Sequence, residues 1–352
     1  MKKKIGLFSL LFLMGSIACI YFFRGKTGSL PIDLKESSNR MIGGQYDSAI
    51  FYAKKIIANS NSAYNQLYAF SIIGYSWFEQ GELDSALFYY SKALTFESTT
   101  NPGLKASSLN MIGLILQEKQ THDKSIKYFR ESISLYETIN SKQLPIVYYN
   151  LAYNQSQTNN IECIESYYKA LEYASDFKDL KYEAYCLSDL GNLMLETKNY
   201  NSAIEYFLAS LDNEYAKNHP RRKAVALQGL GESEFYTRDY SSAKVHALEA
   251  LKLKMENGYE EFLFTSYLLL GRIYRETNEL EEAENNFKRA IIYYPYNERN
   301  KKNVAVFKEL GDVELQLGKL KQSEYYNQIH FEELERQLDE RKQAHNLKII
   351  AI

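Results

Sequence analysis

This 352-residue chain has few prolines and cysteines and almost no net charge, and each of these shortages argues against a class of protein. Only five prolines occur, and since a proline inside a helix costs about 3 kcal/mol, long helices are left uninterrupted. The three cysteines, Cys19, Cys163 and Cys186, lack the paired spacing of a zinc site or a dense disulfide framework. The net charge of −2 offers no long-range attraction to nucleic acid. We therefore expect a helical protein without a structural metal and without nucleic-acid binding, and a single disulfide between Cys163 and Cys186 stays open.

Catalytic motifs are also missing. Gly229-Leu230-Gly231 supplies two glycines of a dinucleotide-binding loop, but Glu234 stands where the third belongs and no strand pattern precedes it. The sequence contains no metalloprotease, serine-hydrolase or phosphate-loop motif. The five histidines are scattered, with no pair at metal-ligand spacing. We therefore predict no catalytic residue, no cofactor and no metal site, which points to a non-enzymatic protein.

What the chain does contain is apolar material, tyrosine and a repeat. Hydrophobic residues make up 45% of the chain and tyrosines number 31, enough for a large folded core with half-exposed aromatic faces. A small residue recurs every 39 or 40 residues, and a weaker copy begins at Ser37. The recurring residues are Gly74, Gly113, Ala152, Gly191, Gly231, Gly271 and Gly311.

A second small residue follows most of these by twelve positions, and an aromatic often lies four residues further on, as at Tyr90, Phe129 and Phe287. Small residues let two helices approach closely, and the aromatic fills the space between them. Short polar turns separate the two expected helices, and prolines fall between repeats or at helix starts. The pattern predicts stacked helical hairpins, each stabilised by its neighbours.

This pattern resembles the tetratricopeptide-repeat (TPR) family across roughly Leu34 to Phe331. The family landmarks are filled by Gly74, Trp77, Gly81, Ala86, Tyr90 and Ala93 in one repeat and by Gly271, Tyr274, Ala283, Phe287, Ala290 and Pro295 in another. A period near 40 exceeds the usual 34 and is similar to the long-repeat branch with kinesin light chains and bacterial quorum-response regulators. The resemblance implies an all-α superhelical solenoid of about seven or eight repeats over residues 30–331. The expected repeats lie near 31–66, 67–105, 106–145, 146–184, 185–224, 225–264, 265–304 and 305–331.

The resemblance also implies that the first helices line a concave groove that holds a protein or peptide. We expect aromatic contacts in the amino-terminal half and cations at the far end, where Arg272, Arg275 or Lys308 would meet an acidic group. The opposing interpretation is that tyrosines at this spacing pack inside the fold. The chaperone-binding clamp of some relatives is missing, because Ser71 and Tyr75, or Asn110 and Leu114, occupy its positions. The candidate groove residues are Tyr68, Tyr75, Phe78, Asn110, Tyr149, Tyr153, Tyr185, Asn192, Phe235, Tyr236, Arg272, Arg275 and Lys308.

Residues 1–29 have the pattern of an export segment. Lys2, Lys3 and Lys4 precede an uncharged apolar run, Ile5 to Phe23, that is near the length needed to cross a bilayer. Three interpretations compete: a signal-anchor, a lipoprotein acylated at Cys19, and a cleaved signal peptide. In each, the rest of the chain lies outside the cytoplasm, as in a bacterial periplasm or cell envelope.

We expect residues 332–352 to form a charged helix, which is either a capping helix or a short coiled coil that pairs two copies. Its thin apolar seam begins just before it, at Phe331, and continues with Leu334 and Leu338. The final apolar residues read like the opening of a second membrane helix. The arrangement is similar to bacterial membrane-anchored TPR regulators with a periplasmic sensor. We therefore expect a membrane-attached protein-interaction module, the sensor half of a signalling or transcriptional regulator. Alternatives are an envelope assembly lipoprotein that acts as a scaffold and, third, an enzyme.

Overall fold

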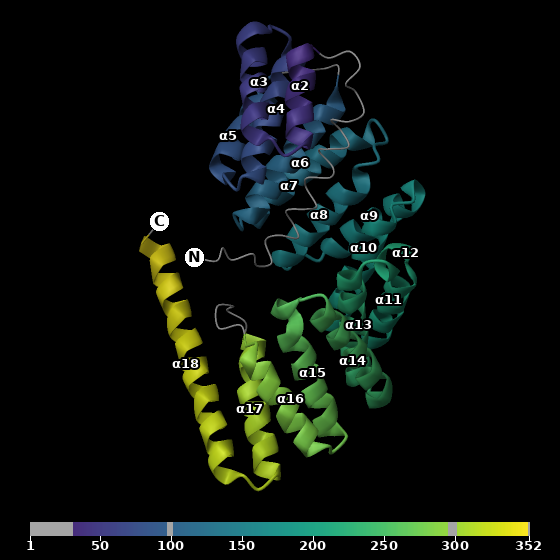
Figure 1. Cartoon of the computed structure of the whole chain (residues 1–352), viewed down its shortest axis with the longest axis vertical. Coiled ribbons are helices and arrows are strands. Elements are labelled where there is room, and N and C mark those ends of the chain that lie inside the picture. The colour runs from purple at the N-terminus through teal and green to yellow at the C-terminus, as the bar shows by residue number, and fades with distance from the viewer. Residues whose placement is uncertain (1–30, 97–100, 295–300, 351–352) are drawn as a thin grey trace. The chain divides into compact units, whose positions relative to one another are not determined.

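The computed structural model describes residues 31–96, 101–294 and 301–350, and every regular element in them is helical (Figure 1). This confirms the predicted all-α class. The longer helices are α2 (Ile32–Ile42), α3 (Tyr46–Asn59), α4 (Ala63–Glu79), α5 (Leu83–Leu94), α6 (Pro102–Glu118), α7 (His122–Glu137), α8 (Leu144–Gln157), α9 (Cys163–Phe177), α10 (Leu180–Glu196), α11 (Tyr200–Asp212), α13 (Pro220–Tyr236), α14 (Tyr240–Glu256), α15 (Leu263–Glu276), α16 (Leu280–Ile292), α17 (Lys301–Gln316) and α18 (Leu320–Ile350), joined by the short α12 (Glu214–Lys217) and η2 (Glu260–Phe262).

The chain divides into two compact units, Met1–Cys186 and Leu187–Ile352, and the boundary falls within α10. In the first unit, helices pack in consecutive pairs from α2 with α3 to α8 with α9. In the second unit, α13 pairs with α14, α15 with α16, and α17 with α18. Each pair is a helical hairpin. Most first helices begin a few residues before the expected repeat starts; α4, for example, begins at Ala63.

The recurring glycines lie where the two helices of a hairpin come closest. A Cβ added to Gly113 would stand 2.6 Å from the Phe129 ring, and one added to Gly271 would stand 2.6 Å from the Phe287 ring. Real Cβ atoms do not approach a ring that closely, so these positions have no room for a larger residue. Phe129 and Phe287 are fully buried. The repeat therefore encodes an aromatic ring of the second helix seated directly on a glycine of the first.

Serine at the small-residue positions supports the same contact through a hydrogen bond. The Ser37 hydroxyl donates to the Ala49 carbonyl at 2.7 Å, between α2 and α3. The Ser125 hydroxyl donates to the Gly113 carbonyl at 2.6 Å, between α7 and α6. Both serines are fully buried, and burying a hydroxyl is tolerated only when it is hydrogen-bonded. The weaker first repeat is thus a genuine hairpin.

Several predictions fall at the ends of the chain. The export segment 1–29 and the lipidation candidate Cys19 lie outside the described residues, as do the last two residues. Over the described part, no helix is both long and apolar enough to span a bilayer. α18 continues through the predicted boundary at 331 without a break, and its seam residues Phe331 and Leu338 are exposed.

Cys163 on α9 and Cys186 on α10 are buried thiols and do not form the disulfide that the sequence left open. Buried cysteines behave as small apolar residues. Each thus takes the place that a small residue has in other repeats.

Candidate functional site

A groove with a volume of about 710 Å³ lies in the second unit, along the first helices of its hairpins. Asn192 of α10, Phe235 and Tyr236 of α13, and Arg272 of α15 all line it. These are four of the residues that the sequence predicted for a partner groove, so the fold brings them together. The rest of the lining comprises Leu195, Glu196, Lys198, Tyr200, Glu232, Phe264, Thr265, Leu268, Leu269 and Asn303.

The aromatic part of the groove is preorganised. Tyr236 stacks on Tyr200 with ring centroids 4.9 Å apart and an angle of 11° between the rings, and Phe235 packs against Tyr236 and Tyr240. Partial burial raises the pKa of the Tyr236 hydroxyl, which therefore stays protonated at neutral pH. Tyr236 nevertheless remains 47% exposed, so it can offer a ring face and a hydrogen-bonding hydroxyl to a ligand.

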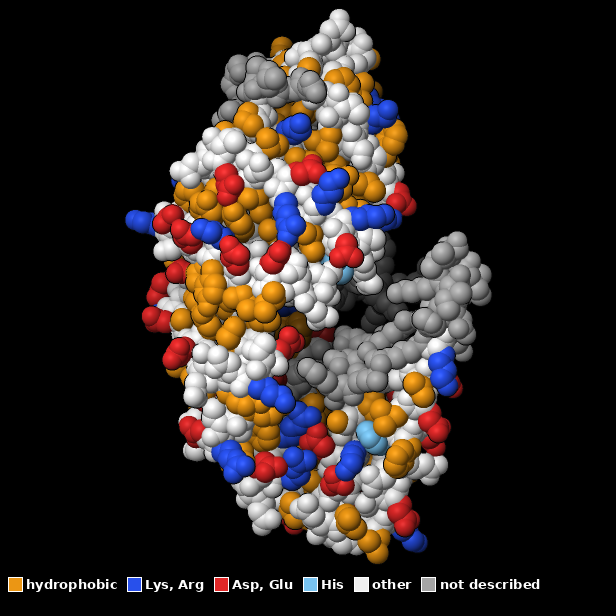
Figure 2. Space-filling model, turned by 180° about the vertical axis from the view of Figure 1, so that it is seen from behind, with side chains coloured by type: hydrophobic (Ala, Val, Ile, Leu, Met, Phe, Trp, Pro, Cys, Tyr) orange, Lys and Arg blue, Asp and Glu red, His pale blue; other side chains and the backbone are white. Residues whose placement is uncertain are grey.

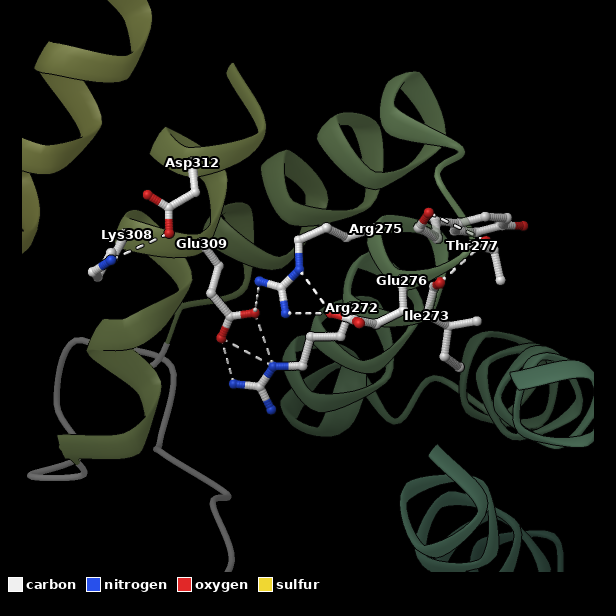
Figure 3. Close-up of polar contacts among 9 residues, drawn as sticks. Arg272, Ile273, Arg275, Glu276, Thr277, Lys308, Glu309 and Asp312 are labelled. Atoms are coloured by element: carbon white, nitrogen blue, oxygen red, sulfur yellow. Dashed lines mark hydrogen bonds and ion pairs between the residues drawn. The ribbon is translucent and has the colours of Figure 1, made fainter. Parts of the chain in front are cut away.

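The cations predicted at the far end are already engaged by carboxylates of the same chain (Figure 3). Arg272 forms a two-nitrogen fork on Glu309, with an Nη2 to Oε1 distance of 2.6 Å, and Arg275 Nη1 lies 3.2 Å from Glu309 Oε2. Arg275 also contacts Glu276. Burial acts to lower the pKa of Arg272, but the hydrogen bonds and charge of Glu309 outweigh it, so the pKa is raised. This cluster ties α15 to α17 and is close to electrically neutral.

Lys308 is similarly engaged: its Nζ lies 3.2 Å from Asp312 Oδ2 on the same helix (Figure 3). A ligand acid would have to compete with Asp312 and Glu309 for these cations. The prediction that Arg272, Arg275 or Lys308 meets an acidic ligand stays untested, but the structure supplies each with an internal acid instead.

Most of the predicted aromatics of the first unit are buried in the packing between helices. Tyr149 contacts Tyr167, Tyr182 and Tyr185 at ring-centroid distances of 5.8 to 5.9 Å. Such clusters stabilise the interior and leave almost no surface for a ligand. Asn110 is likewise buried and accepts a hydrogen bond from Asn150 at 3.4 Å, while Tyr153 is partly exposed. The fully or nearly fully buried members of the predicted set are Tyr68, Tyr75, Phe78, Tyr149 and Tyr185.

A smaller cavity of about 220 Å³ adjoins the groove, and Asn192, Glu232 and Thr265 line both. It also contains two cations that the sequence analysis did not single out, Arg221 of α13 and Lys254 of α14. Lys254 lies on a second helix, whereas the resemblance assigns groove contacts to first helices, so no sequence signal marked it. In the described part of the chain, no three histidine, cysteine or acidic side chains gather closely enough to hold a metal.

Comparison with known proteins supports the repeat assignment. The tetratricopeptide repeat family model matches residues 106–139 and 264–297, which correspond to the hairpins α6/α7 and α15/α16. Regulatory protein RapK of Bacillus subtilis is 26% identical over 196 residues, 49% of each chain. The chain thus matches about half the length of this curated relative.

Solved structures share the fold at low sequence identity. A signal transduction ATPase with numerous domains and a tetratricopeptide repeat sensor from Pyrococcus horikoshii aligns with a TM-score of 0.65 and 17% identity, over 94% of this chain and 55% of that one. The apo quorum sensor NprR of B. thuringiensis aligns with a TM-score of 0.63 and 14% identity, over 92% and 97%. Apo RapI aligns with a TM-score of 0.59 and 17% identity, over 78% and 99%. Helical hairpins with glycine–aromatic contacts, two direct family matches and these shared folds together show that the chain carries tetratricopeptide repeats.

Proposed function

We propose that this protein is a non-enzymatic regulatory module that binds an extended peptide, or an extended segment of a partner protein, in the groove of the second unit. The observation that carries the proposal is the composition of that groove. It joins a stacked aromatic pair, the exposed Tyr236 and the half-buried Tyr200, to apolar side chains and to the amide of Asn192. Aromatic faces supply contact area, and an amide can both donate to and accept from a peptide backbone.

The volume and chemistry of the groove also suit a peptide. About 710 Å³ falls within the range of ligand sites, and the lining combines apolar side chains such as Leu268 and Leu269 with polar side chains such as Asn192 and Thr265, which can contact both the side chains and the backbone of a peptide. The charged side chains Glu196 and Lys198 of the lining offer hydrogen bonds to the polar groups of a peptide. We therefore propose ligand binding as the function of this lining.

The regulatory role is supported by the named relatives, among them a regulatory protein, a quorum sensor and an ATPase with a tetratricopeptide repeat sensor. For this chain we propose the sensor role in the cell envelope, with attachment to the membrane through residues 1–29. The basic residues before the apolar run Ile5 to Phe23 support that placement. A bound peptide would then act as the signal that the module reports.

Photo-crosslinking tests the groove directly. The full-length chain carries benzoylphenylalanine in place of Tyr236 or, as a matched control, in place of Tyr168, which lies on α9 and is exposed to nearly the same extent (47% against 46%). After irradiation in native membranes, we expect a peptide or protein adduct from position 236 and none from position 168. Tyr236→Ala should lower capture of the same partner, because it removes the exposed stacking face.

The control separates specific from general contact. Equal adducts from both positions, or adducts from neither, contradict binding in this groove. If the partner that crosslinks from position 236 were retained equally well, without crosslinking, by the unmodified protein and by Tyr236→Ala, the partner would lie nearby without the aromatic contact that the proposal requires.

A further inference from the structure

α18 carries an apolar seam, Phe331, Leu334 and Leu338, that stays exposed in this structure. The exposed fractions of these side chains are 65%, 37% and 51%, respectively. They are spaced three and four residues apart, so they lie on one face of the helix. α18 packs against α17 and is the last described helix, at the end of the second unit (Figure 1). Within the described residues, no later helix covers the seam.

The position of Phe331 within the repeat indicates that the seam is a packing face. Phe331 lies eight residues after Ser323, the buried small residue of α18 that adjoins Gly311 of α17. In the seven earlier second helices, the residue eight positions after the small residue is always large and apolar, and it is buried or partly buried. These residues are Ile57, Leu94, Ile133, Leu171, Leu211, Leu251 and Ile291. Phe331 has the same position and the same apolar character, but it is exposed.

In earlier hairpins this face contacts the first helix of the next hairpin. Tyr294 precedes Leu334 by one repeat period, is 6% exposed, and contacts Phe307 of α17 with ring centroids 5.1 Å apart. Lys254 lies one period before Tyr294, is 3% exposed, and donates from Nζ to Ser266 Oγ of α15 at 2.7 Å. The seam of α18 is therefore the face with which the repeat joins one hairpin to the next.

The length of α18 constrains what can cover the seam. α18 has 31 residues and is about 46 Å long, whereas α17 has 16 residues. No other described helix has more than 17 residues. Apolar residues spaced three and four apart are also the pattern by which two long helices pair. A second α18 has both the length and the apolar face that the seam requires.

We propose that α18 of a second copy of this chain packs on the seam, so that two chains form a dimer. The two chains would present the same face to each other about a two-fold axis, the commonest arrangement in symmetric oligomers. Pairing removes large apolar side chains of both copies from water, which favours association. The inference selects the pairing of two copies over the capping role that the sequence left open.

The pairing helix is tied to the wall of the groove. Asn303 of α17 lines the groove, and the carbonyl of the next residue, Val304, accepts a hydrogen bond from His330 Nδ1 of α18 at 3.1 Å. A dimer therefore joins two grooves in one complex. The dimer does not depend on the proposed peptide binding, and its absence would leave each groove as it is.

The test measures the mass of the full-length chain, purified in detergent, by multi-angle light scattering with the detergent contribution subtracted. We expect two copies of the 40.9 kDa chain. Phe331→Glu should reduce the mass to one copy, because pairing would bury a carboxylate without a partner. Tyr325→Glu is the matched control and should keep two copies. Tyr325 lies on the same helix and is 59% exposed, at a position that is exposed in every earlier second helix.

Thermal melting and circular dichroism check that the variants fold, and Leu338→Glu replaces Phe331→Glu if that variant does not. A single copy of the unmodified chain at every concentration measured overturns the inference. So does a dimer that survives Phe331→Glu, or one that Tyr325→Glu disrupts equally. If the unmodified chain were a single copy and retained a different membrane protein that Phe331→Glu lost, the seam would hold that protein and the second copy would be wrong.

Discussion

Lys254 shows how a single residue links stability to pH in this protein. Burial, opposed by the charge of Glu232, lowers the pKa of its ammonium from 10.5 to about 8. Between these values the folded protein has released the proton while the unfolded chain still binds it. Stability therefore rises with pH across this window, because the unfolded state binds more protons. Below about pH 8 both states carry the charge, and its burial cost is present in full.

We predict that the free energy of unfolding of the unmodified protein rises from pH 8 to pH 10.5 relative to that of Lys254→Met. The pKa difference corresponds to an effect on the order of 3 kcal/mol. Urea unfolding of both proteins over this range measures it. Tyrosines and other lysines titrate in both proteins, so their contributions cancel in the difference. A difference between the two proteins that does not vary with pH would show that Lys254 titrates as in the unfolded chain.

At the residue scale, the structure places part of the predicted residue set in one groove, and the role of these residues in binding stays a prediction. Asn192, Phe235, Tyr236 and Arg272 meet in one groove, as the repeat register implied. The register does not specify burial: Tyr75 and Tyr236 have the same side chain at first-helix positions, yet one is 2% exposed and the other 47%. That difference depends on which neighbouring side chains cover each ring, and those neighbours come from other helices.

At the scale of elements, several hairpins are held at close spacing by the contact of a glycine with an aromatic ring. Gly113 and Phe129, like Gly271 and Phe287, leave no space for a methyl group between α6 and α7 or between α15 and α16. Gly231 differs, because Ala247 takes the place of the aromatic and a Cβ there would meet backbone atoms at 3.3 Å. Hairpins of one architecture thus differ in their tolerance of a methyl group.

We predict that Gly113→Ala destabilises the protein by about 1–3 kcal/mol, since the Phe129 ring must leave its place. Gly231→Ala should cost less, because the better helix propensity of alanine, worth about 1 kcal/mol, offsets a milder contact. Thermal and urea unfolding of both variants provide the comparison. If the two variants proved equally stable, the ring would not determine the helix spacing.

The helical hairpins could be predicted from the sequence because periodic small and aromatic residues act through short-range packing. The polar turns were predicted as well, but the residue with positive φ within each turn was less evident. Each first helix from α4 onward is followed, two residues after its end, by a residue with positive φ. This residue is glycine at Gly81 and Gly318 and a larger residue in the other hairpins, such as Lys198 and Arg238. L-residues adopt this conformation at a cost, so side-chain type alone did not mark the position. The hairpin geometry imposes it.

At the scale of the whole molecule, the numbers of basic and acidic residues are nearly equal, 42 Lys and Arg against 44 Asp and Glu. On the face drawn in Figure 2, Lys and Arg side chains are interspersed with Asp and Glu. Within the second unit, fully buried Glu314 pairs with Lys288 at 3.0 Å and with Lys319 at 3.5 Å, joining α16 to the hairpin α17/α18. Such ion pairs neutralise acidic and basic side chains within the fold. Together with the net charge of −2, they leave little positive potential to attract nucleic acid, in line with our expectation from the sequence.

The division into two units could not be predicted from the sequence, because the repeat period continues through the boundary within α10 without interruption. The period reports contacts between adjacent helices, which recur in every hairpin. How strongly neighbouring hairpins cohere depends on the side chains at each interface, and these vary from repeat to repeat.

Attachment to a membrane is the prediction that concerns the entire chain. The apolar run Ile5 to Phe23 behind three lysines predicts that the full-length protein remains in bacterial membranes after a carbonate wash, and that deleting residues 5–23 releases it. Cys19→Ala separates the mechanisms: release by this substitution alone indicates a lipid anchor, whereas retention indicates a spanning segment. Protease added to spheroplasts should digest the repeats if they lie outside the cytoplasm. A full-length protein found in the wash, or repeats protected from protease until lysis, would contradict the proposed envelope location while leaving the groove and its ligand chemistry unaffected.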